Sequence, residues 1–148
     1  MFKKLQTRTH QIREEYPPNY EDIKKFFKIE NDKGVIFTYG DTLYNPHKLE
    51  LQEHLLIHEK VHSNQQLKPK EWWNRYFIDR DFRLEQELEA YIAQFAFIKR
   101  IATNKIVKEA LRRLASDLSS EMYGNIISFQ EAETKIRRGA KELLETMV

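Results

Sequence analysis

Residues 55–66 read LLIHEKVHSNQQ, and the HEKVH stretch at positions 58–62 decides how the rest of the chain is interpreted. Apolar residues recur at helical spacing from Leu49 to about Gln66, which predicts a helix over this segment. On an α-helix, residues four apart lie about 40° apart on one face, with about 5–6 Å between their Cβ atoms. The side chains of His58 and His62 can therefore point toward one ion.

Both histidines lie on the side of this helix that its apolar residues predict to be buried. Leu55 and Val61 fall on that side, whereas Glu53 falls elsewhere. Because an imidazole pair buried without partners is costly, the two histidines need hydrogen bonds, a metal ion or both. Core histidines satisfied by hydrogen bonds are therefore the alternative to metal ligands.

His54 lies one turn before His58 on nearly the same face. Three histidines in line do not easily reach one tetrahedral ion. We expect His54 to support the ligands or to belong to the core, and its use as a ligand in place of His62 is the alternative.

Composition restricts both the class of protein and the kind of metal site. The 148 residues, with 41% apolar and 32% charged side chains and only 4 Gly and 4 Pro, predict one ordered, helix-rich domain spanning residues 1–148. The absence of cysteine leaves only nitrogen and oxygen as metal ligands. A formal charge of +2 is too small by itself to imply a nucleic acid or another polyanionic partner.

The apolar segments are too short for a membrane protein. The N-terminus lacks the apolar stretch of a secretory signal, and the longest apolar run, YIAQFAFI, is far below the roughly 20 residues that span a bilayer. We therefore expect a soluble cytoplasmic protein.

The fold class predicted by the whole chain is mainly α with a small β-hairpin (α+β). GVIFTYGDTLYNP, residues 34–46, is the only clear β element, with Gly40-Asp41 as a two-residue turn. Helical patterns occur in EDIKKFFKI (21–29), the HEKVH segment, KEWWNRYF (70–77) after Pro69, and DFRLEQELEAYIAQFAFIKR (81–100). Two more helices follow, at about 103–148, and Ser128 with Glu131 forms a capping-box pattern at the start of the last one.

Glutamates on the helix at residues 81–100 are the candidates for a third ligand. A catalytic zinc held by two histidines takes a third protein ligand and keeps one position open for water. LEQELEAY, residues 84–91, offers Glu85, Glu87 and Glu89. Glu85 and Glu87 lie about 80° from the centre of the apolar stripe of this helix, whereas Glu89 lies about 120° away and is expected to face solvent.

Glu59 has the position of a base. It projects about 100° away from His58, beside the metal ion that the two histidines would hold. We expect it to take a proton from a water molecule that the metal activates, and not to be a ligand itself.

The HExxH at positions 58–62, followed by Glu87-x-x-Ala90, resembles the gluzincin clan of zinc metallopeptidases. The resemblance implies a zincin-like core at about residues 34–99, with His58, His62 and Glu87 as zinc ligands; a thermolysin-like register would select Glu89 instead. Members commonly have Asp or Asn in the position of Tyr91, where the acidic residue helps to orient a ligand histidine. The hairpin is similar to the family's edge strand, which can pair with an extended peptide. More loosely, the frame YGDTLYNP, HEKVHSNQQ, WW and ELEAY looks like small HExxH proteins of phages or prophages.

The leading hypothesis is a small zinc metallopeptidase that acts on a peptide or protein substrate. Glu59 is its base, and Tyr123, His54 and Tyr91 are unranked candidates for a donor to the oxyanion. Tyr91 also fits a core position. Trp72 and Trp73 are expected to cover the core near the site rather than to bind a ligand.

The alternative hypothesis is a small helical binding protein whose zinc site is structural or absent. Its partner, a protein or a nucleic acid, would bind to a basic face. The cations of that face are Lys99, Arg100, Lys105, Lys108, Arg112 and Arg113. A solvated helix surface explains the same residues, because Lys and Arg are ordinarily exposed.

Overall fold

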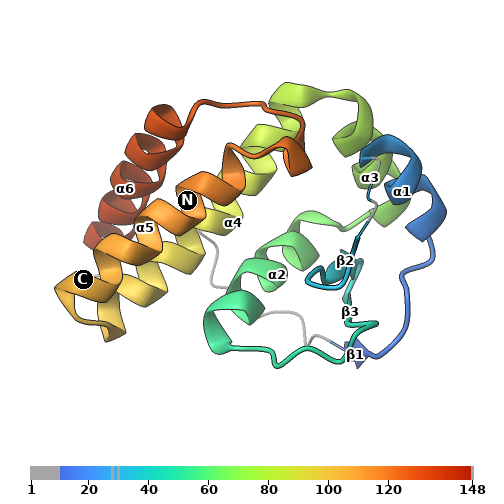
Figure 1. The fold of residues 1–148 in the computed structure, drawn as a ribbon, viewed down its shortest axis with the longest axis horizontal. Coiled ribbons are helices and arrows are strands. Elements are labelled where there is room, and N and C mark those ends of the chain that lie inside the picture. Colours follow the sequence, from blue (N-terminus) through green and yellow to red (C-terminus); the bar gives the residue numbers. More distant parts are fainter. Residues whose placement is uncertain (1–10, 28, 30, 148) are drawn as a thin grey trace. The chain divides into compact units, whose positions relative to one another are not determined.

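The computed structural model describes residues 11–27, 29 and 31–147 (Figure 1). Residues in this range form six α-helices and a small three-stranded sheet. The predicted fold class, mainly α with a small β component, is confirmed. No helix in these ranges is long and apolar enough to cross a membrane.

The chain divides into two compact units, with the division between Asp79 and Arg80. This boundary lies inside residues 34–99, the segment that the sequence predicts to carry the site. The single domain expected from the chain length stays a prediction.

The first unit contains the sheet and three helices. Its elements are β1 (Gln11–Arg13), α1 (Tyr20–Phe27), β2 (Phe37–Tyr39), β3 (Thr42–Tyr44), α2 (Glu53–Gln65) and α3 (Pro69–Ile78). The strand order is β1-β3-β2, so β2 lies at one edge of the sheet. The helix predicted at residues 70–77 and the HEKVH helix are confirmed as α3 and α2, although α2 begins at Glu53 and not near Leu49. The helix predicted at residues 21–29 is present as α1, which ends at Phe27; position 28 of that prediction lies outside the described residues.

The predicted hairpin is present as β2 and β3, which pair in antiparallel register with Thr38 opposite Leu43. Gly40 has φ +63°, a left-handed value that glycine adopts without steric cost, so it fits the first position of the turn. The sheet also has a strand that the sequence did not predict. β1 pairs in parallel with β3, and all three of its residues are exposed.

The core of the first unit is largely aromatic. Trp72, Trp73, Tyr76 and Phe77 of α3 are buried, and the ring centroids of Trp72 and Tyr76 are 4.7 Å apart in a stacked arrangement. Leu43 of the central strand is fully buried. This core supports the hairpin and α2 in the same unit.

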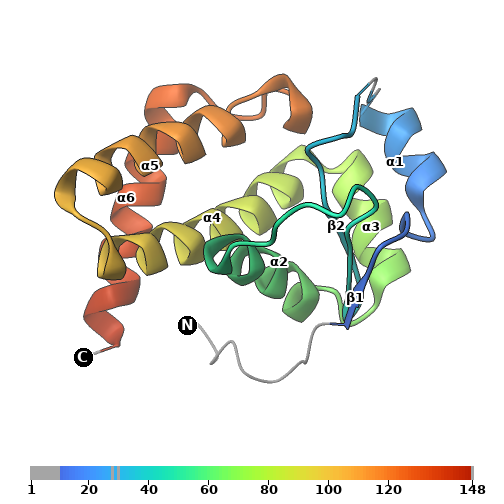
Figure 2. The same ribbon diagram turned by 60° about the horizontal axis from the view of Figure 1, so that its bottom comes forward.

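The second unit contains three long helices that pack on one another: α4 (Arg80–Ile101), α5 (Asn104–Leu118) and α6 (Phe129–Thr146), with the 3-10 turn η1 (Glu121–Tyr123) between α5 and α6. Figure 2 shows the same helices from another direction. The predicted cap of the last helix is confirmed, because the Ser128 hydroxyl accepts a hydrogen bond from the Glu131 N–H. The core of the second unit consists mainly of small and branched side chains, among them Ala93, Leu114, Leu118, Ile136 and Ala140.

Candidate metal centre

The histidines of α2 are buried, as their position on the helix predicts. His58 is 7% exposed and His62 is 6% exposed, and Val61 between them is buried as well. Glu53 on the other side of the helix is exposed. The spacing of four residues therefore produces an inward-facing imidazole pair.

The distance within this pair fits two ligands of one tetrahedral ion. The Nε2 atoms of His58 and His62 are 3.2 Å apart. Two ligand nitrogens at about 2.0–2.1 Å from a tetrahedral zinc ion lie about 3.3 Å from each other. The same separation also suits a hydrogen bond between the two rings. The distance is therefore compatible with metal ligands and with core histidines that bond to each other.

Glu87 joins the histidines in a group able to bind a metal ion. The candidate ligand atoms of His58, His62 and Glu87 lie within 4.8 Å of one another, and all three side chains are buried. Glu85 and Glu89 are exposed. Of the three glutamates that the sequence left open, Glu87 is the one that is buried and belongs to this group, and its role as a ligand stays a prediction.

His54 is not a member of this group. Its side chain is half-buried, and its Nε2 lies 2.7 Å from the Gln52 side-chain oxygen. The alternative in which His54 replaces His62 as a ligand therefore has no support in the structure.

Glu59 lies beside the histidines and is bonded to the hairpin. The Thr38 hydroxyl on β2 donates a 2.6 Å hydrogen bond to Glu59 Oε2. Glu59 is half-buried and is not a member of the ligand group. Its role as a base stays a prediction, and its hydrogen bond with Thr38 is a contact that the sequence analysis missed.

Further buried hydrogen bonds fasten the hairpin to α2 and α3. The Gly40 N–H donates to Gln66 Oε1 at 2.8 Å, and the Ser63 hydroxyl donates to the Gly40 carbonyl at 2.7 Å. The Thr38 carbonyl accepts from Gln66 Nε2 and from Trp73 Nε1, at 3.1 and 3.2 Å. These bonds hold Thr38, and with it the contact to Glu59.

The same bonds restrict strand addition at β2. A carbonyl oxygen has two lone pairs, and two side chains already donate to that of Thr38. β2 is at an edge of the sheet, as the sequence analysis expected, but this carbonyl has no free lone pair for an added peptide strand. Pairing with an extended peptide stays a prediction for the rest of the edge.

The aromatic residues named from the sequence belong mainly to the cores of the units. Trp72 and Trp73 are buried, and the Trp72 ring centroid is 5.7 Å from that of His62, so they cover the core next to the histidines as predicted. Tyr91 is also buried, as a core residue would be, and its hydroxyl lies 2.8 Å from that of Tyr123.

The basic residues behind the alternative hypothesis are exposed. All six fall on the surface of the second unit: Lys99, Arg100, Lys105, Lys108, Arg112 and Arg113. A solvated helix surface accounts for this exposure, and binding of a partner to this surface stays a prediction.

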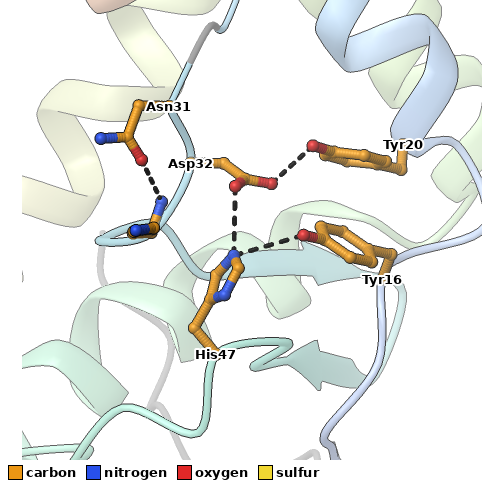
Figure 3. A network of polar contacts seen from close by, with 6 residues as sticks. Tyr16, Tyr20, Asn31, Asp32 and His47 are labelled. Atoms are coloured by element: carbon orange, nitrogen blue, oxygen red, sulfur yellow. Dashed lines mark hydrogen bonds and ion pairs between the residues drawn. The ribbon is translucent and has the colours of Figure 1, made fainter.

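A second polar cluster, which the sequence analysis did not single out, lies in the first unit (Figure 3). The Tyr20 hydroxyl donates to Asp32 Oδ2 at 2.5 Å, and His47 Nε2 is 3.1 Å from Asp32 Oδ1. The Tyr16 hydroxyl is 3.3 Å from the same nitrogen. The hydrogen bond from Tyr20 is the main cause that lowers the pKa of Asp32, and it raises the pKa of the Tyr20 hydroxyl. The cluster ties α1 to the segments before and after the hairpin.

No protein family model, no curated protein and no solved structure matches this chain. The similarity to gluzincins and to phage proteins therefore rests on the motif alone and stays a prediction.

Proposed function

We propose that this chain is a zinc-dependent metallopeptidase in which His58, His62 and Glu87 hold the metal ion. The observation that carries the proposal is the buried group of these three side chains, with ligand atoms within 4.8 Å of one another. Two imidazoles and one carboxylate, with no cysteine in the chain, form the donor set of many catalytic zinc sites. The three side chains would supply three ligands to the ion.

When bound, zinc acts as a Lewis acid that makes a water molecule acidic enough to be a nucleophile near neutral pH. Glu59 would act as the base that takes a proton from the water molecule and as the acid that returns it to the leaving amine. The Thr38 hydroxyl donates a hydrogen bond to Oε2 of Glu59 and so holds the carboxylate in place. Oε1 of Glu59 would then be the oxygen that receives the proton. Burial of the histidine pair keeps bulk water away from the ligands.

Three features favour a peptide bond as the substrate. The HExxH helix follows a hairpin, as in the family that the motif resembles. The base lies next to β2 of that hairpin through its contact with Thr38. The third ligand, the carboxylate of Glu87, follows on a later helix, α4.

The proposal is tested with a mixed peptide library incubated with the zinc-loaded protein and analysed by mass spectrometry. We expect cleavage by the wild-type protein, inhibition by a chelator, and loss of cleavage in Glu59→Gln with zinc still bound. Cleavage that persists in Glu59→Gln, or that is insensitive to chelation, would contradict the proposal. A zinc-loaded wild-type protein that cleaves no peptide in the library would also contradict it.

A further inference from the structure

We infer that Gln65 is a positioning residue that fixes the tautomer of His62 and thereby presents His62 Nε2 to the metal ion. This inference rests on the proposed metal site. It assigns a task to a side chain that the HExxH motif does not include.

The contact that carries the inference lies within α2. His62 Nδ1 is 2.9 Å from Gln65 Oε1. Residues three apart are neighbours on a helix surface, so this contact needs no distortion of the backbone. An amide oxygen only accepts hydrogen bonds, so Nδ1 carries the proton and donates it.

The other ring nitrogen is the one that faces the site. A neutral imidazole with its proton on Nδ1 has its lone pair on Nε2. That atom lies 3.2 Å from Nε2 of His58, within the ligand group. Gln65 therefore selects the tautomer in which the inward nitrogen of His62 can bind a metal ion.

The ring of His62 is also held in orientation. It is 6% exposed, and the Trp72 ring lies next to it with a centroid distance of 5.7 Å. Because Nδ1 is bonded to Gln65, rotation of the imidazole would break that hydrogen bond. Rotation would also bring the imidazole against the indole of Trp72. The imidazole is thus arranged before a metal ion arrives, which reduces the entropy lost on binding.

Gln65 is an uncharged partner of His62, so it does not raise the basicity of the imidazole as a carboxylate would. Ligand histidines commonly donate to a carboxylate, a backbone carbonyl or water, and a carboxylate makes the imidazole more basic. Gln65 supplies the orientation without the negative charge. Gln65→Glu should therefore bind zinc at least as tightly as the wild type, whereas Gln65→Met, which is similar in shape but has no acceptor oxygen, should bind it less tightly.

Neighbouring residues provide the controls. Gln66 bonds to Thr38 and Gly40 and is needed for the hairpin contacts, so its substitution would not be informative. Asn64 is half-buried on the same turn and is not part of the site. Asn64→Leu is therefore the matched control, and Gln65→Leu is a second variant in case Gln65→Met does not fold.

The tautomer is measured first, by nitrogen NMR of the metal-free protein with labelled histidine. We expect the Nδ1–H form of His62 in the wild type and in Asn64→Leu, and a mixture with the Nε2–H form in Gln65→Met. An Nε2–H form in the wild type, or an unchanged tautomer in Gln65→Met, would overturn the inference.

Zinc affinity is then measured by competition with a chelator. Loss of the residue that orients a ligand histidine typically lowers affinity about 10–100-fold, and we expect this loss in Gln65→Met but not in Asn64→Leu. Equal affinity of Gln65→Met and the wild type would overturn the inference alone. Absence of zinc binding by the wild type would overturn the proposed function, and the role of Gln65 with it.

Discussion

At the scale of single residues, the contact between Thr38 and Glu59 connects the hairpin to the proposed base. The 2.6 Å hydrogen bond joins side chains that are 21 positions apart in the sequence. Thr38 is 3% exposed, and its carbonyl is bonded by two further side chains. Its hydroxyl is therefore held in place and can orient the carboxylate of the proposed base, Glu59.

Thr38→Val keeps the shape of the side chain and removes the hydroxyl. Hydrogen bonds to charged groups contribute about 1.5–3 kcal/mol, so we expect kcat/KM to fall by at least about 10-fold. Zinc affinity should change little, and Thr38→Ser should restore turnover. A peptide-cleavage assay with zinc quantified in each variant measures both effects; full activity in Thr38→Val would remove Thr38 from the account.

Asp32 gives the first unit a dependence on pH. Its pKa is lowered, mainly by the hydrogen bond from Tyr20, so it stabilises the folded state above the unfolded pKa of about 3.9. That stabilisation is lost as the pH falls through the lower pKa of the folded protein. Asp32→Asn should therefore cost about 1–2 kcal/mol near pH 7, by loss of charged hydrogen bonds.

Urea unfolding of the wild type and Asp32→Asn at several pH values tests this expectation. The difference in the free energy of unfolding should shrink as the pH falls below about 4, where the unfolded carboxylate also protonates. Glu50→Gln, which changes an exposed carboxylate, is the control and should have little effect at any pH. A difference that stays constant down to the acid limit would show that the charge of Asp32 is not the cause.

At the scale of elements, the close packing of α6 on α4 depends on Gly139. A Cβ atom at this position would lie 2.2 Å from Cδ1 and 2.7 Å from Cγ1 of Ile92. Gly139→Ala would gain about 1 kcal/mol of helix propensity but would overpack the contact by about 1–3 kcal/mol. We expect a net destabilisation of up to about 2 kcal/mol, measured by chemical denaturation.

A double-mutant cycle isolates this contact. Ile92→Ala removes the atoms that the new methyl group would meet, so Gly139→Ala should be neutral or stabilising in that background. Additive effects of the two substitutions would show that the helices adjust at no cost.

Elements with local signals could be predicted from the sequence. The Gly40 turn, the Ser128 cap and Pro69 at the start of α3 are each determined by residues within a few positions. β1 could not be predicted in this way, because its bonds are to distant backbone: the Gln11 N–H donates to the Asp41 carbonyl, and the Arg13 carbonyl accepts from the Asn45 N–H. The late start of α2 follows from the extended backbone at Gln52 and the left-handed Lys48, which apolar spacing does not reveal.

The same distinction applies to the candidate site. The spacing of four between His58 and His62 follows from helix periodicity, and both imidazoles are buried as that periodicity predicts. Periodicity placed Glu85 and Glu87 equally close to the apolar stripe, so it did not predict that Glu87 is buried while Glu85 is exposed. Gln65 was within reach of the same reasoning, as it lies three positions after His62. Thr38 was not, because only the folded hairpin brings it to Glu59.

At the scale of the whole molecule, zinc binding should stabilise the folded chain by mass action. A ligand at about 100 times its Kd adds roughly 2.7 kcal/mol when it binds only the folded state. For a chain of this length that corresponds to a rise in Tm of about 5–10 °C. Thermal unfolding of metal-free protein with and without zinc measures the shift, which should be absent in His62→Ala; an equal shift in that variant would indicate binding elsewhere.

The stoichiometry and affinity of zinc test the central claim most directly. Untagged protein is stripped of metal and titrated with Zn²⁺, and the wild type is compared with His62→Ala, Glu87→Gln and the exposed control Glu89→Gln. We expect one zinc ion per chain, with binding lost in His62→Ala, weakened in Glu87→Gln and unchanged in Glu89→Gln. A wild-type protein with no specific zinc, or with zinc that both His62→Ala and Glu87→Gln retain, would contradict it.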